Sequence, residues 1–262
     1  MEVKVHKIGN VEDCDRRVVR IVHISDTHMR HNDYIDHLPH GDILVHSGDF
    51  SAFSIGRYFG NKTSDRDRVI DEINKFFGKV NFEHKVFVPG NHELSFDVNT
   101  KAYIEERLTD VHYLQDSSIN IEGINIYGSP WNSKRWTSYA RGFAKNANKL
   151  IKHWNLIPKQ TDILVTHLPP EGILDLATKK FSGLKNLFSR NSACDVCCSS
   201  HEAYEHWGCK DLRNIILKGV RPTLHLFGHV HEDTGIQEID GITFSNAALK
   251  INQTINVFDY YI

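Results

Sequence analysis

Eight side chains of the kinds that bind metal ions and transfer protons occur in short clusters along the sequence. They are Asp26, His28, Asp49, Asn91, His92, His167, His229 and His231. Carboxylate oxygens, an amide oxygen and imidazole nitrogens are ligands that suit Mn, Fe, Zn and Co. Imidazole also exchanges protons near neutral pH. These residue types therefore indicate metal chemistry combined with acid–base chemistry.

The spacing within the clusters supports this interpretation. In an extended chain residues i and i+2 point to the same side, so Asp26 and His28 can face one ion. Asp49 follows Gly48, which lets the backbone turn closely, and its two carboxylate oxygens can bridge two ions. A single such pair is common by chance, and a solvated or hydrogen-bonded core histidine is the alternative for each. The conjunction of five clusters in one chain favours a site.

Short apolar, β-branched runs precede the clusters and predict buried strands. We expect these strands at residues 20–25, 42–46, 85–88, 162–166 and 223–227. Helices are predicted at 64–77, with Ser64 as the N-cap and Gly78 as the stop, and at 99–108, 142–154 and 210–218. Residues 235–239, 242–247 and 254–260 predict an antiparallel meander. This order indicates an α/β sandwich with mixed sheets, in which ligands gather at the carboxyl ends of strands.

The ordered motifs resemble those of the calcineurin-like metallophosphoesterases. The resemblance rests on Asp26-x-His28, Gly48-Asp49, Gly90-Asn91-His92-Glu93, His167 and Gly228-His229-x-His231, and spans about residues 20–231. It implies a four-layer αββα sandwich with two mixed β-sheets, the metallophosphoesterase fold, and a dinuclear metal site. We expect one such domain over residues 1–262.

The resemblance also implies a role for each of these residues. Asp26, His28 and His231 would hold one ion, and Asn91, His167 and His229 the other. Asp49 would bridge the two ions, and His92 would act as the acid or transition-state stabiliser. Two divalent ions, of which Mn, Fe or Zn are expected, bring about +4 against about −2 from the aspartates. Such a positive pocket suits a phosphate, whose phosphorus a metal-bound hydroxide would attack.

A narrower resemblance involves Tyr127 to Asn132, Trp136, Arg141-Gly142, Thr166 to Pro170 and Gly208 to His229. These segments are similar to a subfamily of metallophosphoesterase-domain proteins related to class III cyclic nucleotide phosphodiesterases. We expect Trp131, Asn132 and Arg141 to line the substrate cleft, with the tryptophan stacking on a base and the arginine facing phosphate. The alternative is a tryptophan packed under a turn and a solvated helix arginine.

The resulting hypothesis is a phosphodiesterase for small phosphodiesters, including 2′,3′- or 3′,5′-cyclic nucleotides. A phosphomonoesterase or protein phosphatase would use the same ions. However, Leu94 and Ser95 follow Glu93 where protein phosphatases have an arginine. A low-turnover nucleotide-binding regulatory module is the non-enzymatic alternative.

The composition indicates which classes of binding partner and which cellular compartment to expect. The 31 Lys and Arg residues balance the 33 Asp and Glu residues among 262, which argues against binding to duplex nucleic acid or a membrane surface. No apolar stretch reaches the roughly 18 residues of a membrane span. The expected partner is a small phosphoester or nucleotide, and five cysteines without a disulfide pattern favour the cytoplasm. Oligomeric state is not indicated.

Two further groups of residues stand apart from the motifs. Cys194, Cys197, Cys198 and Cys209 lie near His201 and His206. A C-x-x-C pair is half of a zinc motif, but the second half lacks the usual spacing, so a reduced, redox-sensitive thiol loop is favoured. Among the 17 histidines, we expect His23, His46 and His225 in the core. We expect His6, His31, His37, His40, His84, His112 and His153 at the surface.

Overall fold

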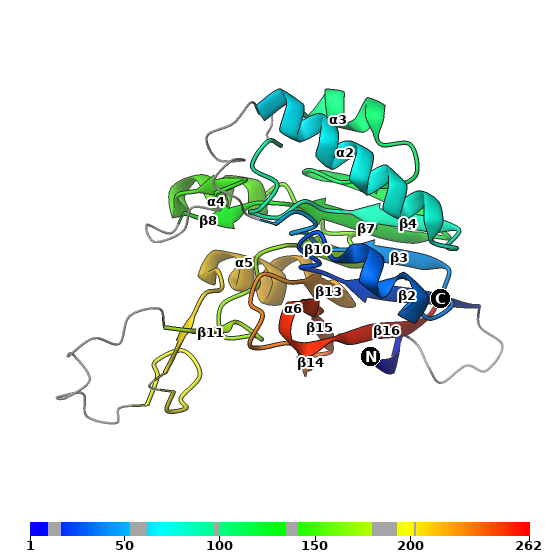
Figure 1. Cartoon of the computed structure of the whole chain (residues 1–262). Coiled ribbons are helices and arrows are strands. Elements are labelled where there is room, and N and C mark those ends of the chain that lie inside the picture. The colour runs from blue at the N-terminus through cyan, green and yellow to red at the C-terminus, as the bar shows by residue number, and fades with distance from the viewer. Residues whose placement is uncertain (10–16, 53–61, 97–99, 135–140, 180–192, 202) are drawn as a thin grey trace.

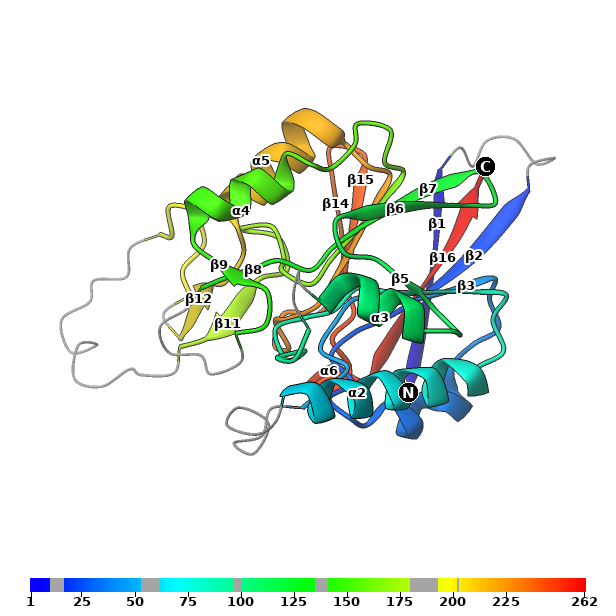
Figure 2. The same cartoon turned by 90° about the horizontal axis from the view of Figure 1, so that it is seen from above.

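Two six-stranded sheets packed face to face form the centre of the molecule, and helices cover both outer faces (Figures 1 and 2). This computed structural model describes residues 1–9, 17–52, 62–96, 100–134, 141–179, 193–201 and 203–262. The arrangement is the expected αββα sandwich with mixed sheets. None of the helices in these ranges combines the length and apolarity that a membrane crossing requires.

The first sheet carries the early clusters. Its strand order is β1 (Glu2–Gly9), β16 (Thr254–Tyr261), β2 (Val18–Ile24), β3 (Ile43–His46), β4 (His84–Phe87) and β5 (His112–Tyr113). Strands β2 to β5 are parallel, β16 is antiparallel to β2, and β1 pairs with β16 in parallel. The carboxyl ends of β2, β3 and β4 therefore lie along one edge.

The second sheet carries the later clusters. Its order is β14 (Gly235–Ile239), β15 (Ile242–Asn246), β13 (Leu224–Phe227), β10 (Ile163–Thr166), β7 (Ile124–Ser129) and β6 (Ser117–Ile121). The four central strands are parallel, and β14 and β6 form antiparallel edges. Two short ladders lie outside the sheets, β8 (Asn132–Ser133) with β9 (Ala144–Lys145) and β11 (Leu176–Thr178) with β12 (Tyr204–His206).

The helices divide between the two faces (Figure 2). The helices α2 (Lys62–Lys79) and α3 (Lys101–Arg107) cover the first sheet, and the 3-10 helix η1 (His31–His37) packs beside α2. The helices α4 (Ala147–Trp154) and α5 (Lys210–Ile215) cover the second sheet. A π-helical turn, η4 (Ile216–Val220), continues α5, and α6 (Leu249–Asn252) connects β15 to β16.

Alternate residues of the central strands belong to two different apolar clusters, one on each face of the sheet. Ile21 and Val45 of the first sheet belong to one apolar cluster with Val165 of the second, between the sheets. Val22 and Leu44 belong to the cluster that includes the buried faces of the helices. Since both faces of each strand are buried, the strands are continuously apolar rather than alternating.

The five predicted strands are confirmed, but several other elements differ. Helix α2 begins at Lys62 and ends at Lys79, so Ser64 lies inside its first turn and Gly78 inside its last. Helix α4 begins only at Ala147 because β9 precedes it. The antiparallel meander is wrong in its third strand: β16 joins the first sheet between β1 and β2, because apolar residues on both of its faces require a central position.

Candidate active site

The predicted clusters meet where the carboxyl ends of the two sheets converge. Asp26 follows β2, Asp49 follows β3, and Asn91 follows β4, all in the first sheet. His167 follows β10 in the second sheet, and its Nδ1 lies 2.8 Å from the carbonyl oxygen of Ser47. A hydrogen bond thus joins the two sheets at the point where their ligands meet.

Unusual backbone conformations turn the chain sharply at these strand ends. Asp26, Asp49 and His229 all have left-handed backbones, with φ of 54°, 54° and 73°. Non-glycine residues rarely adopt this conformation, and it is often found at functional sites. The extended-chain argument for Asp26 and His28 is wrong, since His28 also has a positive φ of 46°. A turn, rather than strand alternation, brings the two side chains together.

Two glycines allow the close packing of this region. A Cβ atom on Gly228 would lie 2.1 Å from Oδ2 of Asp26, and one on Gly90 would lie 2.3 Å from Oδ1 of Asp49. Both distances are far below van der Waals contact, so any side chain would displace a carboxylate. The motif glycines are therefore explained by the approach of backbone to ligand.

Asp26, His28 and His231 form the first group of ligand atoms. Nε2 of His231 lies 3.0 Å from Oδ1 of Asp26, and Nε2 of His28 lies 3.2 Å from Nε2 of His231. Ligands about 2.1 Å from one ion are separated by about this distance. Burial lowers the pKa of His28 to about 4, which favours the neutral, metal-binding form.

Asp49, Asn91, His167 and His229 form the second group. Nε2 of His167 lies 3.1 Å from Oδ1 of Asn91 and 3.3 Å from Oδ1 of Asp49. Ligand atoms of Asp49, His167 and His229 lie within 4.8 Å of one another; Asp49 and His167 are buried and His229 is half-buried. Although burial opposes it, the two aspartates raise the pKa of His167 to about 9, so binding an ion there would release a proton.

Asp49 also contacts the residue predicted to act on the substrate. Its ligand atom groups with those of His28 and His92 as well as with those of the second group. Nε2 of His92 lies 3.6 Å from Oδ2 of Asp49, and the His92 side chain keeps 19% of its surface exposed. His92 thus lies at the accessible side of the centre, while Asp49 lies between the two groups.

Residues 19–233 match the family model described as calcineurin-like phosphoesterase. The chain belongs to this family. Human metallophosphoesterase domain-containing protein 1 is 32% identical over 253 residues, covering 88% of this chain and 66% of the relative. UPF0046 protein C25E10.12 of Caenorhabditis elegans is 33% identical over 258 residues, covering 92% and 79%. The chain thus spans slightly less than two thirds of the human protein.

A solved crystal structure supports the same fold. It shares 14% sequence identity with this chain at a TM-score of 0.56, and the match covers 88% of this chain and 90% of that chain. At this identity the likeness concerns the fold alone. The calcineurin-like phosphoesterase fold is therefore shown by sequence and by structure together.

Glu93 has a role in this calcineurin-like centre that the sequence did not reveal. Its buried carboxylate accepts backbone hydrogen bonds from Gly90 at 2.6 Å, Ser51 at 2.8 Å and Asp49 at 3.1 Å. It thereby ties the loop after β3 to the loop after β4. Burial and the charge of Asp49 raise the pKa of Glu93 to about 7. Its position in the Gly90-Asn91-His92-Glu93 motif was the available signal.

Three further histidines are buried beneath the site and hydrogen-bonded, as expected. His23 contacts the hydroxyl oxygens of Ser245 and Ser47 at 2.8 and 2.9 Å. His46 accepts a hydrogen bond from the backbone of Gly48 at 3.3 Å, next to Asp49. His225 contacts Thr166 at 2.9 Å. They hold the strand ends rather than ligating.

The predicted substrate residues divide into two kinds. Trp131 is 1% exposed, donates from Nε1 to Asp116 at 2.7 Å, and stacks on His153 with ring centroids 3.7 Å apart. Asn132 is also buried and donates to the carbonyl of Pro130. Because protein covers both side chains, the structure fits packing under a turn and not stacking on a base. Trp136 lies outside the described residues.

Arg141, the third predicted substrate residue, is not packed under protein in this way. It is exposed, and the backbone N–H of its neighbour Gly142 donates a 2.9 Å hydrogen bond to the carbonyl of Asn91. The segment carrying Arg141 is therefore attached to the loop that carries Asn91 and His92. A guanidinium at this position suits a phosphate oxygen.

Proposed function

We propose that this chain is a metal-dependent phosphodiesterase for small phosphodiesters, with cyclic nucleotides as the first substrates to test. The observation that carries the proposal is the position of Asp49 between two groups of ligand atoms, with the accessible His92 beside it. Bound divalent ions would acidify a water molecule and neutralise charge on the phosphoryl oxygens.

The donor atoms fit a pair of such ions. All seven predicted ligands offer oxygen or imidazole nitrogen, the set that suits Mn, Fe and Zn. Asp26, His28 and His231 would hold one ion, and Asn91, His167 and His229 the other, with Asp49 shared. The closest ligand–ligand distances, 3.0 to 3.3 Å, agree with ligands of a common ion.

His92 and Arg141 would supply the remaining chemistry. The His92 imidazole would donate a proton to the leaving oxygen, a step that matters most for diesters with poor leaving groups such as the alkoxide of a cyclic nucleotide. Arg141 would bind a non-bridging oxygen and orient the substrate. Its guanidinium would offset the single negative charge of a diester.

A comparison of matched substrates tests the proposal. The protein is stripped with a chelator and reloaded with Mn²⁺, Zn²⁺ or Mg²⁺, and kcat/KM is measured for bis(p-nitrophenyl) phosphate and p-nitrophenyl phosphate. We expect metal-dependent hydrolysis with the diester preferred, followed by turnover within a panel of 2′,3′- and 3′,5′-cyclic nucleotides. Preference for the monoester would instead indicate a phosphomonoesterase. Metal-dependent hydrolysis of neither would favour the nucleotide-binding module.

The role of Arg141 has its own test. Arg141→Ala is expected to raise KM for the diester at least tenfold while leaving metal content unchanged. Arg68→Ala, which removes an exposed arginine on α2 far along the chain, is the matched control. Equal KM values for the two variants would remove Arg141 from the substrate site.

A further inference from the structure

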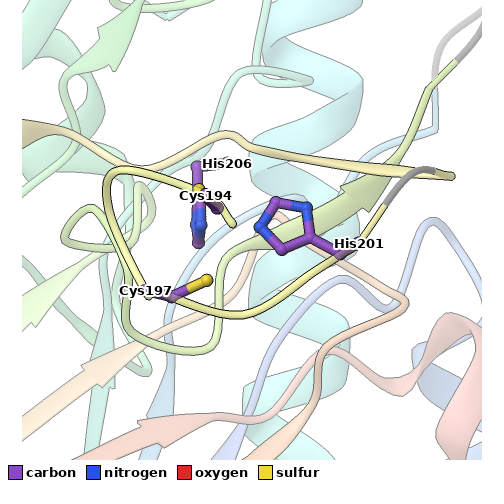
Figure 3. A group of neighbouring side chains, drawn as sticks. All are labelled: Cys194, Cys197, His201 and His206. Carbon is purple, nitrogen blue, oxygen red and sulfur yellow. The ribbon is translucent and has the colours of Figure 1, made fainter. Parts of the chain in front are cut away.

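Four side chains outside the active site surround a second space. They are Cys194, Cys197, His201 and His206, and Figure 3 shows them grouped around a common centre. Each offers one ligand atom, and the four atoms all lie within 4.8 Å of one another. Cys198 is exposed and Cys209 is buried beside Pro170, so neither belongs to this group. Of the four cysteines considered from the sequence, two thus group with the two neighbouring histidines.

A tight loop presents the two sulfur atoms. The carbonyl of Cys194 accepts a 2.8 Å hydrogen bond from the backbone of Cys198, whose φ of 59° closes the turn. The backbone N–H of Val196 donates to Sγ of Cys194 at 3.4 Å. Such N–H donors favour a thiolate, which is the form that binds metals.

The hydrogen bonds of the two histidines determine which ring nitrogen is available to bind a metal ion. Nδ1 of His206 lies 2.6 Å from Oδ1 of Asp175, and Nδ1 of His201 lies 3.1 Å from the carbonyl of Tyr204. A carboxylate and a carbonyl only accept, so Nδ1 donates in both rings, and in the neutral, metal-binding form of each ring Nε2 keeps its lone pair. Both Nε2 atoms are buried, and among the described residues they have no hydrogen-bond partner other than the neighbouring thiols.

This arrangement is typical of a metal ligand held by a second residue. Metal-binding histidines usually donate their other N–H to a carboxylate or a carbonyl. Asp175 is itself 1% exposed and accepts a hydrogen bond from Gly208. The buried, oriented Nε2 atoms beside two thiols thus point to a missing partner at the centre of the group.

We propose that Cys194, Cys197, His201 and His206 bind one structural Zn²⁺ ion. Two thiolates and two imidazoles are a complete tetrahedral set that leaves no open position, as in structural rather than catalytic zinc sites. The two thiolates neutralise the charge of the ion. Soft sulfur ligands also favour zinc over manganese or magnesium, so this site differs chemically from the sulfur-free active site.

The zinc site would fix the position of a residue at the edge of the active site. His206 lies in β12, which pairs with β11 in a short antiparallel ladder. The next residue, Trp207, donates its backbone N–H to the carbonyl of Asp175, and its ring lies 5.7 Å from that of His229. A zinc ion that holds His206 therefore also holds Trp207 against a predicted catalytic ligand.

Cobalt substitution of the full-length protein tests the proposal. Cobalt bound to thiolate gives charge-transfer absorption in the near ultraviolet, which the oxygen and nitrogen ligands of the active site cannot produce. We expect this band in the wild-type protein and in Asp49→Ala, which alters only the catalytic centre. Cys197→Ser should abolish the band, whereas Cys198→Ser, at the neighbouring exposed cysteine, should retain it.

A variant that increases the thiolate–cobalt band is also needed, because a variant that lacks a ligand is uninformative if it does not fold. His201→Cys would raise the number of thiolates from two to three and the band intensity about 1.5-fold. Zinc-grown Cys198→Ser should contain one more zinc ion per chain than Cys197→Ser. The proposal is overturned if wild-type protein shows no thiolate–cobalt band, or if Cys197 and Cys198 variants hold equal zinc. A Cys194–Cys197 disulfide in freshly purified protein would also overturn it.

Discussion

The backbone N–H of His92 donates a 2.8 Å hydrogen bond to Oδ1 of Asp49, the carboxylate placed between the two ligand groups. The predicted acid and the predicted bridging ligand are therefore held at a fixed separation by the main chain. Removing the imidazole of His92 leaves this hydrogen bond in place, whereas removing the carboxylate of Asp49 does not. The two side chains can thus be tested separately.

We expect His92→Ala to keep the metal of the active site and lose turnover, and Asp49→Ala to lose both the active-site metal and turnover. Loss of a general acid typically lowers rates by about 10² to 10⁴. Metal content by elemental analysis and kcat for a cyclic nucleotide, whose alkoxide leaving group needs a proton, distinguish the two variants. An active Asp49→Ala protein would contradict the assignment of Asp49 as the shared ligand.

Glu93→Gln is expected to weaken metal binding by about 10- to 100-fold, although it replaces none of the predicted metal ligands. Glutamine replaces one acceptor oxygen with an NH₂ group, which would face a backbone N–H of Ser51, Gly90 or Asp49. Metal affinity is measured by competition with a fluorescent chelator. Glu106→Gln, at an exposed glutamate of α3, serves as the control. Equal affinities in the two variants would show that the loop connection is dispensable.

Gly228→Ala should displace the carboxylate of Asp26. The added Cβ would lie 2.1 Å from both Oδ2 of Asp26 and Oγ of Ser25. A shift of about 1 Å in such a group can lower turnover about 100-fold. Gly219→Ala is the matched control, because its Cβ would meet nothing within 4 Å. Near-normal activity in Gly228→Ala would mean that the strand end can relax.

The buried histidine His225 should make the fold sensitive to acid. Burial lowers its pKa from 6.5 to about 3, so between these values the unfolded chain binds a proton that the native protein does not. Stability is therefore retained above pH 6.5 and falls as the pH drops toward 3, by about 1.4 kcal/mol per pH unit for this group.

His225→Gln removes this contribution and should flatten the dependence of unfolding free energy on pH between 6.5 and 5. Urea denaturation at several pH values measures the slope for the variant, for wild type and for His40→Gln at an exposed position. Identical slopes in all three proteins would assign the acid sensitivity to other groups.

The strand ends could be predicted from the sequence because each carries its own local pattern, an apolar run followed by a turn with ligands. The position of β16 could not, since its pairing with β1 and β2 depends on residues more than 200 positions away. The alternating pattern on both sides of the Asp240-Gly241 turn predicted a meander, and burial of both faces of β16 decided otherwise.

The burial of aromatic and histidine side chains was equally hard to predict from local sequence. His31 was expected at the surface but is 1% exposed and stacks on Phe50, with ring centroids 4.0 Å apart. Trp131 was expected at the cleft but packs on His153. A single sequence shows that an aromatic ring needs a partner, but not whether that partner is protein or ligand. The spacing of the cysteines and histidines likewise concealed a compact group of four.

The ligands of each predicted ion come from both sheets, with Asp26 and Asn91 on one side and His231 and His167 on the other. The separation of the sheets therefore contributes to the separation of these predicted ligands. A change of volume at Val45 or Val165, in the apolar cluster between the sheets, is expected to shift them relative to one another without replacing any of them.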